Sequence, residues 1–567
     1  MSTIIDESVL SEVERIKADS AGLWGPLATE IADDTTTHLS EDAKQILKFH
    51  GSYQQEDRDQ RRERKKAGLE PAYMFMVRSK LPGGVLTAEQ YLLHDQITDR
   101  YGDGTLRVTT RQGFQLYGVL KGNLRATIHE LNEALVTTLG ACGDVVRNVC
   151  TCPAPHAGRH REEVIELARL VRDETLPRTR AYHDIWVDGS RVTQVLSPEP
   201  DPLYGERYLP RKFKITFAFP EDNCTDIYAN DLGFLVVAQG GAIVGYNVVV
   251  GGSFGQTHGK AETYPRLASH LGFVRPDDVV EVAKAIIAVQ RDHGNRENRK
   301  RARLKYLLDE RGVDWFRDQV ELQLGRPLEP WAPVDVSDVE DHLGWHEQDN
   351  GRWFLGVFIE NGRIKDEGSL RLRSALRTIV ERFRTGVHLT MQQNLLLTDV
   401  APEDREEIDR ILLEHNVLPS EHLTLIRRHS MACPALPTCP LAVAESERVF
   451  PEVLDELEVA LSRLGLSGES IIVRMTGCPN GCARPYNAEL AFVGRSLNKY
   501  VVYVGGNAEG TRMAEVYADL VPLNELVDTE RPLLERYSEE RLPGERFGDF
   551  WARVGLVPLP SAARLRA

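Results

Sequence analysis

The chain lacks any run of eighteen uninterrupted apolar residues, the length that a membrane-crossing helix needs. The nearest candidate, residues 233–252, is broken by Gln, Asn and several Gly residues and predicts two strands joined by a turn. The first residues are acidic and lack the apolar core of a secretion signal. We therefore expect a protein of the reducing cytoplasm that does not span a membrane.

An excess of positive charge is also missing. Lys and Arg number 69 against 85 Asp and Glu, which gives a net charge of −16. This balance argues against general nucleic-acid binding, because phosphate backbones require a basic surface. Basic runs at residues 58–66 and 296–305 are interpreted as solvated faces. No GxGxxG motif follows a strand and opens a helix, so any nucleotide or flavin chemistry must come from outside the chain.

Cysteine is scarce, with eight residues in 567. Cys433 and Cys439 are separated by five residues, and Cys478 and Cys482 by three, in stretches rich in Pro and Gly. Such stretches hold thiols on rigid turns instead of helices. Four thiolates held in this way suit a [4Fe-4S] cluster, whose irons each take one soft ligand. The pattern predicts electron transfer.

A structural zinc site is the main alternative, although zinc knuckles favour C-x2-C to C-x4-C spacing. Disulfides are disfavoured in a reducing compartment. Cys142 and Cys224 have no partner nearby in the sequence, and Cys150 with Cys152 is interpreted as a packed pair on a strand.

The chain of 567 residues is long enough for two to four domains, and it contains an internal repeat. Residues 106–118, LRVTTRQGFQLYG, are echoed by residues 387–399, VHLTMQQNLLLTD, with an offset of 280 that aligns Gln112 with Gln392. Each copy continues into an amphipathic helix and then into a cysteine-containing turn. We infer duplication and fusion about a pseudo-two-fold axis. A site on that axis would draw residues from both copies.

Hydrophobic periodicity predicts a mixed α/β chain. Residues 1–45 are expected to form a helix and a polar stretch, either a mobile arm or a partner-docking segment. The predicted helices span 161–176, 278–292, 442–463 and 507–519, and the predicted strands span 184–189, 213–219, 232–249, 471–475, 488–493 and 500–505.

Cations gather on strands of the first copy. Lys212 and Lys214 share one face of a strand whose other face is aromatic, and Arg107 and Arg111 share a face of another. Guanidinium groups bind carboxylates in bidentate fashion, and lysines supply charge and protons. Beside a redox cluster, the set predicts a polyanionic cofactor and a small anionic substrate. Its members are Arg78, Arg107, Arg111, Arg147, Lys212 and Lys214.

Taken together, TGCPNGC, CPALPTC, TRQGFQ, RNV and LPRKFK resemble the sirohaem and [4Fe-4S] nitrite/sulfite reductases. The similarity covers nearly the whole chain. FHGSYQQEDRD, LPRTRAYHDIW, ENGRI and FGDFWARVG look most like the haemoprotein (beta) subunits of assimilatory NADPH-sulfite reductases. The resemblance implies six-electron reduction of sulfite to hydrogen sulfide at a sirohaem coupled to a [4Fe-4S] cluster.

The resemblance also implies residue roles. Cys433, Cys439, Cys478 and Cys482 would ligate the cluster, and Cys482 would bridge it to the sirohaem iron. Arg78, Arg147, Lys212 and Lys214 would bind sulfite. Sirohaem would be contacted by Arg107, Arg111, Gln115, Arg211, Gln393 and Asn480. The sequence departs from the family pattern at Tyr117, Gly143 and Ala483, where histidine, asparagine and glycine are common.

An α+β fold of three domains with internal duplication is implied as well. Its predicted parts are an N-terminal extension (1–70), a ferredoxin-like half-domain (71–150), a sirohaem and substrate domain (151–340), a second half-domain (341–425) and a cluster and sirohaem domain (426–567). The implied partner is an FAD- and FMN-containing flavoprotein that oxidises NADPH, in a hetero-oligomer. A ferredoxin-fed sulfite or nitrite reductase and a non-catalytic zinc or iron–sulfur protein are the alternatives.

Overall fold

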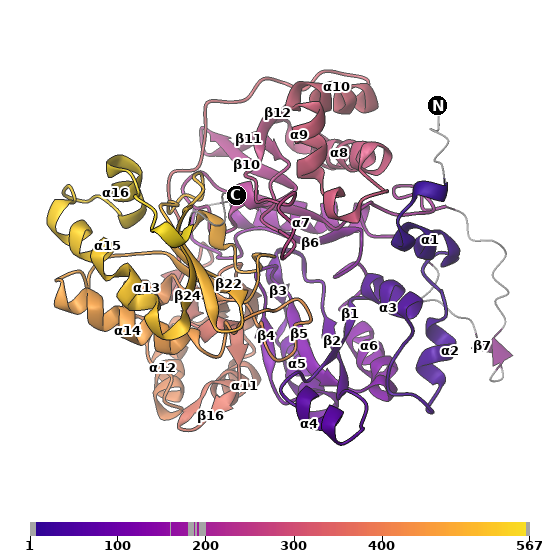
Figure 1. Cartoon of the computed structure of the whole chain (residues 1–567), viewed down its shortest axis with the longest axis horizontal. Coiled ribbons are helices and arrows are strands. Elements are labelled where there is room, and N and C mark those ends of the chain that lie inside the picture. The colour runs from indigo at the N-terminus through magenta and orange to yellow at the C-terminus, as the bar shows by residue number, and fades with distance from the viewer. Residues whose placement is uncertain (1–6, 159, 180–185, 188–189, 192–199, 563–567) are drawn as a thin grey trace.

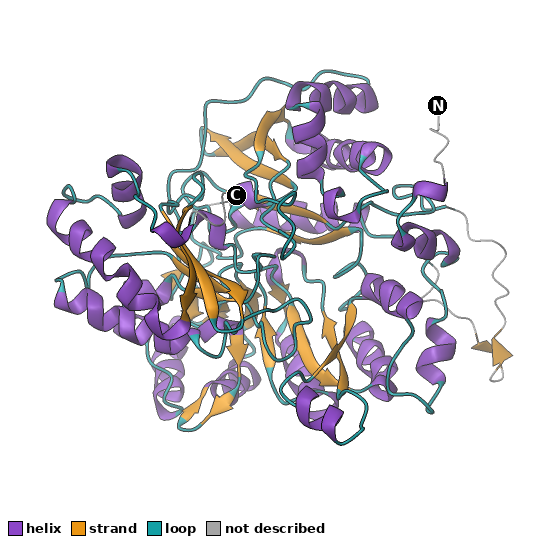
Figure 2. Cartoon of the chain, viewed as in Figure 1, coloured by secondary structure: helices purple, strands orange, loops and turns teal. Residues whose placement is uncertain are grey.

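The computed structural model describes residues 7–158, 160–179, 186–187, 190–191 and 200–562. Figure 1 shows the chain gathered around four principal sheets, and in Figure 2 the strands occupy the middle of the molecule with most helices outside them. No described helix is both long and apolar enough to cross a membrane.

The first sheet has the strand order β1-β2-β5-β4-β15 and is antiparallel throughout. Helix α5 contacts β4 and β5, and α6 packs on α5. A capping box between Thr87 and Gln90 starts α5. The elements are β1 (Ser52–Glu56), β2 (Tyr73–Arg78), β4 (Leu106–Val108), β5 (Phe114–Val119), β15 (Arg363–Ile364), α5 (Ala88–Tyr101) and α6 (Leu124–Glu133).

The second sheet repeats this plan in the order β13-β14-β19-β18-β3. Helix α11 packs on α12 and also on α5 of the first copy. The elements are β3 (Val85–Leu86), β13 (Gly344–Glu347), β14 (Trp353–Val357), β18 (Gly386–Leu389), β19 (Leu395–Val400), α11 (Leu372–Phe383) and α12 (Arg405–Glu414). A small hairpin, β16 (Asp366–Glu367) with β17 (Leu370–Arg371), precedes α11.

The two copies exchange their edge strands. β3 of the first copy pairs with β18, and β15 of the second copy pairs with β4. The glycines before these strands, Gly84 and Gly362, have φ of +75° and +76°. A Cβ atom there would lie 2.3 Å from the backbone oxygen of Leu389 or Val108, so only glycine fits this close crossing. The exchange fuses the copies into one body.

Two further sheets share one topology. The orders β6-β9-β10-β11-β12 and β20-β21-β22-β23-β24 both run parallel, parallel, antiparallel, antiparallel. The first comprises β6 (Val146–Cys150), β9 (Phe213–Ala218), β10 (Leu232–Gln239), β11 (Ala242–Val250) and β12 (Ser269–Val274), with α7 (Arg161–Glu174), α8 (Val279–His293), α9 (Leu304–Arg311) and α10 (Val313–Leu324). The second comprises β20 (Met431–Ala432), β21 (Val473–Thr476), β22 (Leu490–Ser496), β23 (Lys499–Val504) and β24 (Glu515–Pro522), with α13 (Leu425–Arg428), α14 (Phe450–Arg463), α15 (Leu526–Glu540) and α16 (Phe547–Val554).

The paired sheets confirm the mixed α/β fold and its duplication, but the predicted offset of 280 is wrong by one residue. Thr109 N–H donates to the Gly113 carbonyl and Thr390 N–H to the Asn394 carbonyl, so the equivalent turns differ by 281. Gln112 therefore corresponds to Gln393, not Gln392, and both adopt positive φ, of 50° and 69°. The domain boundaries stay predictions.

The N-terminal segment packs against the body through α1 (Glu12–Asp19), α2 (Leu27–Ala32) and α3 (Glu41–Leu47). Lys17 is fully buried and donates a hydrogen bond to the Leu209 carbonyl at 2.7 Å. Because β1 belongs to the first sheet, residues 12–56 form part of the folded body instead of a free arm.

Two helix predictions need correction. Residues 507–519 do not form a helix: Gly510 has φ +70°, the Asn507 side chain accepts from Thr511 and Arg512 N–H groups, and β24 starts at Glu515. The helix predicted at 442–463 begins only at Phe450. The predicted strand at 184–189 lies largely outside the described residues, which there include only β7 (Trp186–Val187), paired with β8 (Ser190–Arg191).

Candidate active site

Cys433, Cys439, Cys478 and Cys482 occupy turns that follow the neighbouring parallel strands β20 and β21. Ala432 of β20 lies opposite Met475 of β21, so Cys433 and Cys478 leave the same edge of the sheet. The Gly477 N–H donates to Cys433 Sγ at 3.3 Å. Cys433 and Cys478 are buried, Cys439 is partly buried and Cys482 is exposed.

The spacing of these sulfur atoms separates the two metal hypotheses. No three of the four lie within 4.8 Å of one another, as judged over the described residues. Four thiolates around one zinc ion, with Zn–S bonds of about 2.3 Å, would lie about 3.8 Å apart. The four sulfur atoms therefore do not converge closely enough to surround one zinc ion, as judged over the described residues.

Cys482 lies where the two copies meet. The Thr110 hydroxyl, from the turn between β4 and β5, donates to the Cys482 carbonyl at 3.0 Å. The Asn480 side-chain amide donates to Cys482 Sγ at 3.2 Å. Asn480, which was predicted to contact the sirohaem, thus contacts the sulfur atom of Cys482. Thr110 of the first copy holds the turn that carries Cys482.

The predicted sulfite-binding residues come from the first copy. Arg78 ends β2 and donates to Cys142 Sγ at 3.3 Å. Arg147 on β6 donates to the carbonyls of Gly143 and Ala141. Lys212 and Lys214 stand at the start of β9, and their ammonium groups make no hydrogen bond or ion pair with another described residue.

The pKa shifts of these residues show which of their charges influence one another. Burial lowers the pKa of Lys214 to about 7, helped by Arg111 and Arg303, while Asp231 and Cys482 oppose the shift. Burial, Arg303 and Arg211 hold the pKa of Lys212 well below its ordinary value. Burial raises the pKa of Cys433 to about 12, and the charge of Cys482 adds to this rise. A charge on Cys482 therefore influences the pKa of Cys433 and the pKa of Lys214.

The residues predicted to contact a macrocycle have varied partners. Arg111 donates to Asn230 at 2.7 Å, and Arg211 lies 3.7 Å from Asp144. Gln393 donates to the Asn361 carbonyl at 3.4 Å and Gln115 to Met76 Sδ at 3.4 Å. Arg107, 1% exposed, bonds Glu447 and the Ala432 carbonyl beside Cys433.

Sequence reasoning missed Arg303 and Tyr53. Arg303 forms a bidentate pair with Asp231, with oxygen contacts of 3.0 and 2.8 Å, and its charge lowers the pKa values of both lysines. Burial raises the pKa of Tyr53, which a hydrogen bond with Arg147 partly offsets. The basic run at 296–305 was the available signal for Arg303.

The three departures from the family pattern have local explanations. Tyr117 donates its hydroxyl to Gln115 Oε1 at 2.9 Å. Gly143 has φ +85°, and a Cβ there would lie 2.8 Å from Phe49, so asparagine would require Phe49 to move. Ala483 is fully buried.

The donor set fits a polyanion. Arg78 Nε and Arg111 Nε are buried without a hydrogen-bond partner, and the ammonium groups of Lys212 and Lys214 make no ion pair with a described residue, although the charge of Asp231 acts on Lys214. Buried donors of one sign require an anion that satisfies them. A polycarboxylate macrocycle supplies both the charge and the acceptors.

The fold and the site together define a redox protein that binds an iron–sulfur cluster beside a polyanionic cofactor. The model of the nitrite and sulphite reductase 4Fe-4S domain matches residues 166–328. The ferredoxin-like half-domain model of nitrite/sulfite reductases matches residues 68–134 and 346–415. The chain belongs to the nitrite and sulphite reductase family. The 4Fe-4S match lies on the first copy, while the four cysteines lie on the second.

Similar proteins cover nearly the whole chain. A protein of Geobacillus kaustophilus named sulfite reductase [NADPH] hemoprotein beta-component is 46% identical over 96% of both chains. Its namesake from Chromohalobacter salexigens is 45% identical over 97% of this chain and 96% of its own. The structure of Mycobacterium tuberculosis NirA matches with a TM-score of 0.77 at 24% identity, over 96% of both chains, which supports the fold.

Proposed function

We propose that this chain is the haemoprotein component of an assimilatory sulfite reductase and reduces sulfite to hydrogen sulfide with electrons from an NADPH-oxidising flavoprotein. The observation that carries the proposal is the contact between the two copies at the cysteine turns: Thr110 donates to the Cys482 carbonyl, and Arg107 donates to the Ala432 carbonyl beside Cys433. Relatives with 44–46% identity bear the matching name, which supports sulfite as the substrate.

Sirohaem coupled to a [4Fe-4S] cluster would supply the iron that binds sulfite and the electrons that reduce it. Cys433, Cys439, Cys478 and Cys482 would hold the cluster, with Cys482 shared by both metal groups. Arg107, Arg111, Gln115, Arg211, Gln393 and Asn480 would hold the macrocycle. In the position described, Arg107 also fixes the Ala432 carbonyl next to Cys433.

Arg78, Arg147, Lys212 and Lys214 would bind and protonate the substrate. The carbonyls of Gly143 and Ala141 fix the Arg147 guanidinium, so it is positioned before the anion arrives. Lys214, with a pKa of about 7, can hold a proton and release it near neutral pH, as general acid catalysis requires. Each oxygen of sulfite that leaves as water needs such protons.

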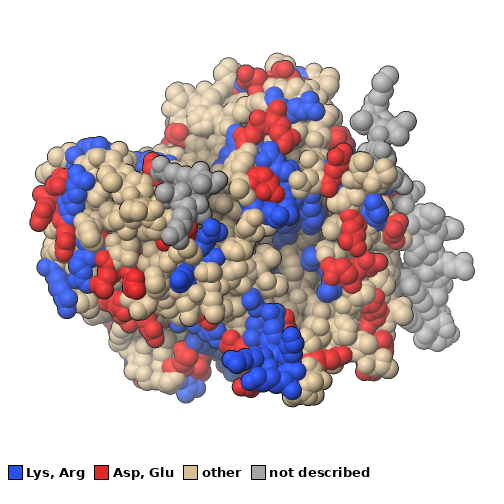
Figure 3. Space-filling view, in the orientation of Figure 1, with Lys and Arg blue, Asp and Glu red and all other residues tan. Residues whose placement is uncertain are grey.

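Electrons would enter beside Cys439. Arg58 donates hydrogen bonds to the carbonyls of Cys439 and Ala442, at 2.9 and 2.8 Å. The helix that follows it, α4 (Arg61–Lys66), has the sequence RRERKK and no buried residue. Figure 3 shows Lys and Arg gathered over α4. This helix is solvated, as the sequence predicted, and its basic surface would suit an acidic electron-donor protein.

The donor distinguishes the two candidate functions. Purified holoprotein should release sulfide with NADPH and the flavoprotein, as a cytoplasmic hetero-oligomer. Turnover with reduced ferredoxin alone would overturn the flavoprotein assignment and favour the ferredoxin-fed enzyme. A higher kcat/KM for nitrite than for sulfite would overturn the substrate assignment.

A further inference from the structure

A second group of thiol and imidazole side chains lies outside the site described above. Cys152, Asp222, Cys224 and His342 are all buried, with exposed fractions of 0–2%, and one donor atom from each lies within 4.8 Å of the others. Cys152 follows β6, Asp222 and Cys224 follow β9, and His342 precedes β13. Because β6 and β9 pair in parallel, their following turns meet at one edge. Cys224, which has no partner nearby in the sequence, is part of this group.

The distances in the group fit a tetrahedron. Cys152 Sγ lies 3.3 Å from His342 Nε2, which lies 3.1 Å from Asp222 Oδ2. Cys224 Sγ lies 3.2 Å from the same oxygen. Tetrahedral zinc, with bonds of about 2.3 Å to sulfur and 2.0–2.1 Å to nitrogen and oxygen, separates such donors by about 3.3–3.6 Å. The observed separations need to widen by only a few tenths of an ångström to hold the ion.

The remaining polar atoms of the group are already occupied. Asp222 Oδ1 accepts from the N–H groups of Cys224 and Glu340, at 3.0 and 3.2 Å. His342 Nδ1 lies 3.0 Å from His156 Nε2 and 3.7 Å from a Glu340 oxygen. Such contacts orient metal-bound imidazoles in known sites. One sulfur, nitrogen or oxygen from each residue is left to face the centre.

The arrangement does not match a cysteine–histidine–aspartate nucleophile. In that device the imidazole uses one nitrogen for the nucleophile and the other for the carboxylate. Here the Cys152 sulfur and the Asp222 oxygen both face His342 Nε2. Convergence of three donors on one point is what a metal ion requires.

The local charges balance with a divalent cation. Two thiolates and one carboxylate around a divalent ion leave one negative charge. Arg161 stands 3.5 Å from Asp222 Oδ2, and its guanidinium lies 3.5 Å from the centre of the Phe219 ring. This buried cation neutralises the remaining charge.

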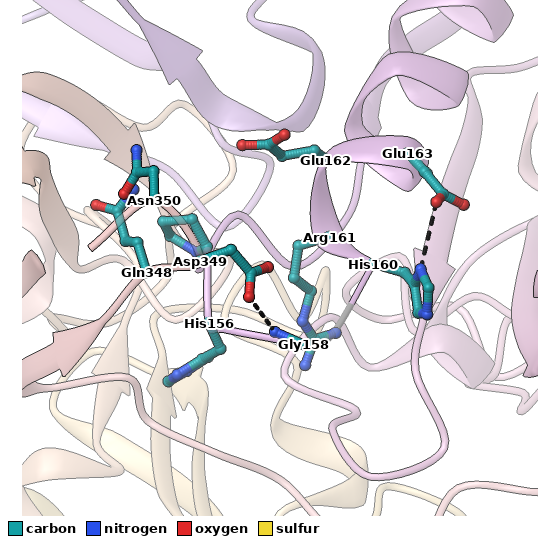
Figure 4. Close-up of a pocket in the computed structure, with 10 residues that line it drawn as sticks. His156, Gly158, His160, Arg161, Glu162, Glu163, Gln348, Asp349 and Asn350 are labelled. Carbon is teal, nitrogen blue, oxygen red and sulfur yellow. Dashed lines mark hydrogen bonds and ion pairs between the residues drawn. The ribbon is translucent and has the colours of Figure 1, made fainter. Parts of the chain in front are cut away.

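A pocket lies next to the group. Figure 4 shows a pocket of about 420 Å³ whose lining includes His156 and Arg161, together with Gln348, Asp349 and Asn350. His156 contacts His342 and Arg161 contacts Asp222. The pocket is therefore lined by two residues that contact the group, although none of the four proposed ligands lines it.

We propose that Cys152, Asp222, Cys224 and His342 bind one structural zinc ion. Two soft sulfur ligands with one nitrogen and one oxygen suit zinc, and four protein ligands leave no open position for catalysis. The ion joins the sheet of β6 and β9 to the segment that leads into β13. It thus fastens the connection between the first and second copies.

X-ray absorption at the zinc edge tests the site in the holoprotein, since haem and cluster iron absorb at another energy. The expected result is one zinc per chain, in addition to full iron and acid-labile sulfide, with two sulfur and two nitrogen or oxygen ligands. A four-sulfur shell would place the zinc at Cys433, Cys439, Cys478 and Cys482 and overturn the proposal. Less than 0.1 zinc per chain after growth with added zinc would also overturn it.

Substitution provides a second test. Cys224→Ser should lower the zinc content at least tenfold and leave the iron content unchanged. Cys150→Ser is the matched control, because Cys150 is a buried cysteine outside the group, and it should retain zinc. Full zinc in the Cys152→Ser, Cys224→Ser double variant would contradict the assignment. Should these variants fail to fold, the wild-type absorption spectrum still decides the matter.

Discussion

The Thr110 hydroxyl donates a hydrogen bond to the Cys482 carbonyl at 3.0 Å. Thr110 belongs to the first copy and Cys482 to the second, so one hydrogen bond joins the turn between β4 and β5 to the turn that carries the exposed thiol. In the proposed site, the cations come from the first copy and the cysteines from the second. Neither copy alone contains the whole site.

Lys212→Ala and Lys214→Ala should each reduce sulfide release by about 100-fold or more, the usual loss when a proton donor is removed. Sirohaem absorbance and iron content should not change, because the predicted haem contacts lie elsewhere. Lys499→Ala, on the exposed end of β23, is the control. Unimpaired turnover in both the Lys212→Ala and the Lys214→Ala variant would show that neither lysine donates protons during sulfite reduction.

Lys214 should make the cofactor-free chain more stable as pH rises above 7. Its folded-state pKa is about 7 against an ordinary value of 10.5, so the unfolded chain binds more protons between these values. The free energy of unfolding therefore rises with pH across this window, and the destabilisation is fully present below pH 7. Urea unfolding of wild type and Lys214→Met measures it. Identical pH profiles would contradict the shift.

Gly143→Ala should destabilise the fold by about 1–3 kcal/mol, because a Cβ atom at this position meets Phe49 and the backbone is left-handed. Gly205 also has a positive φ, of +67°, but nothing within 4 Å of a Cβ. Gly205→Ala therefore measures the backbone strain alone. Thermal unfolding should show the larger loss for Gly143→Ala, and equal losses would mean that Phe49 moves freely.

Charge reversal on α4 should weaken the donor interaction. Arg61→Glu with Lys65→Glu should raise the KM for the flavoprotein several-fold and reduce its salt dependence. Turnover driven by a small chemical reductant should be unchanged, since it needs no docking surface. Arg531→Glu with Arg536→Glu, on the exposed face of α15, is the matched control. An unchanged KM in the α4 variant would place the donor elsewhere.

The hydrophobic pattern and the internal repeat of the sequence predicted much of the fold. The alternation of residues 213–219 predicted β9, and the repeat at residues 106–118 predicted the duplication. The helix predicted at 507–519 failed because Asn507 and Gly510 form a turn that local hydrophobicity does not reveal. The predicted repeat offset was wrong because it was chosen to align identical residues. The backbone hydrogen bonds of the two turns show instead that Thr109 is equivalent to Thr390.

The site was predictable where the ligands are close in sequence, as with Cys478 and Cys482. The site residues could not be predicted where contacts between distant parts of the chain bring them together. Arg303 pairs with Asp231, which lies 72 residues earlier in the chain, and Cys152 contacts His342 across 190 residues of chain. Such pairs depend on how distant segments fold together, and the basic run at 296–305 could not identify the partner of Arg303.

The central claim is that Cys482 serves the cluster and the sirohaem iron together. Sulfide release by purified Cys482→Ser, driven by reduced methyl viologen so that no partner is needed, tests it most directly. We predict that sulfide release becomes undetectable while Cys150→Ser retains the wild-type rate. Sulfide release by Cys482→Ser at the wild-type rate would contradict the account.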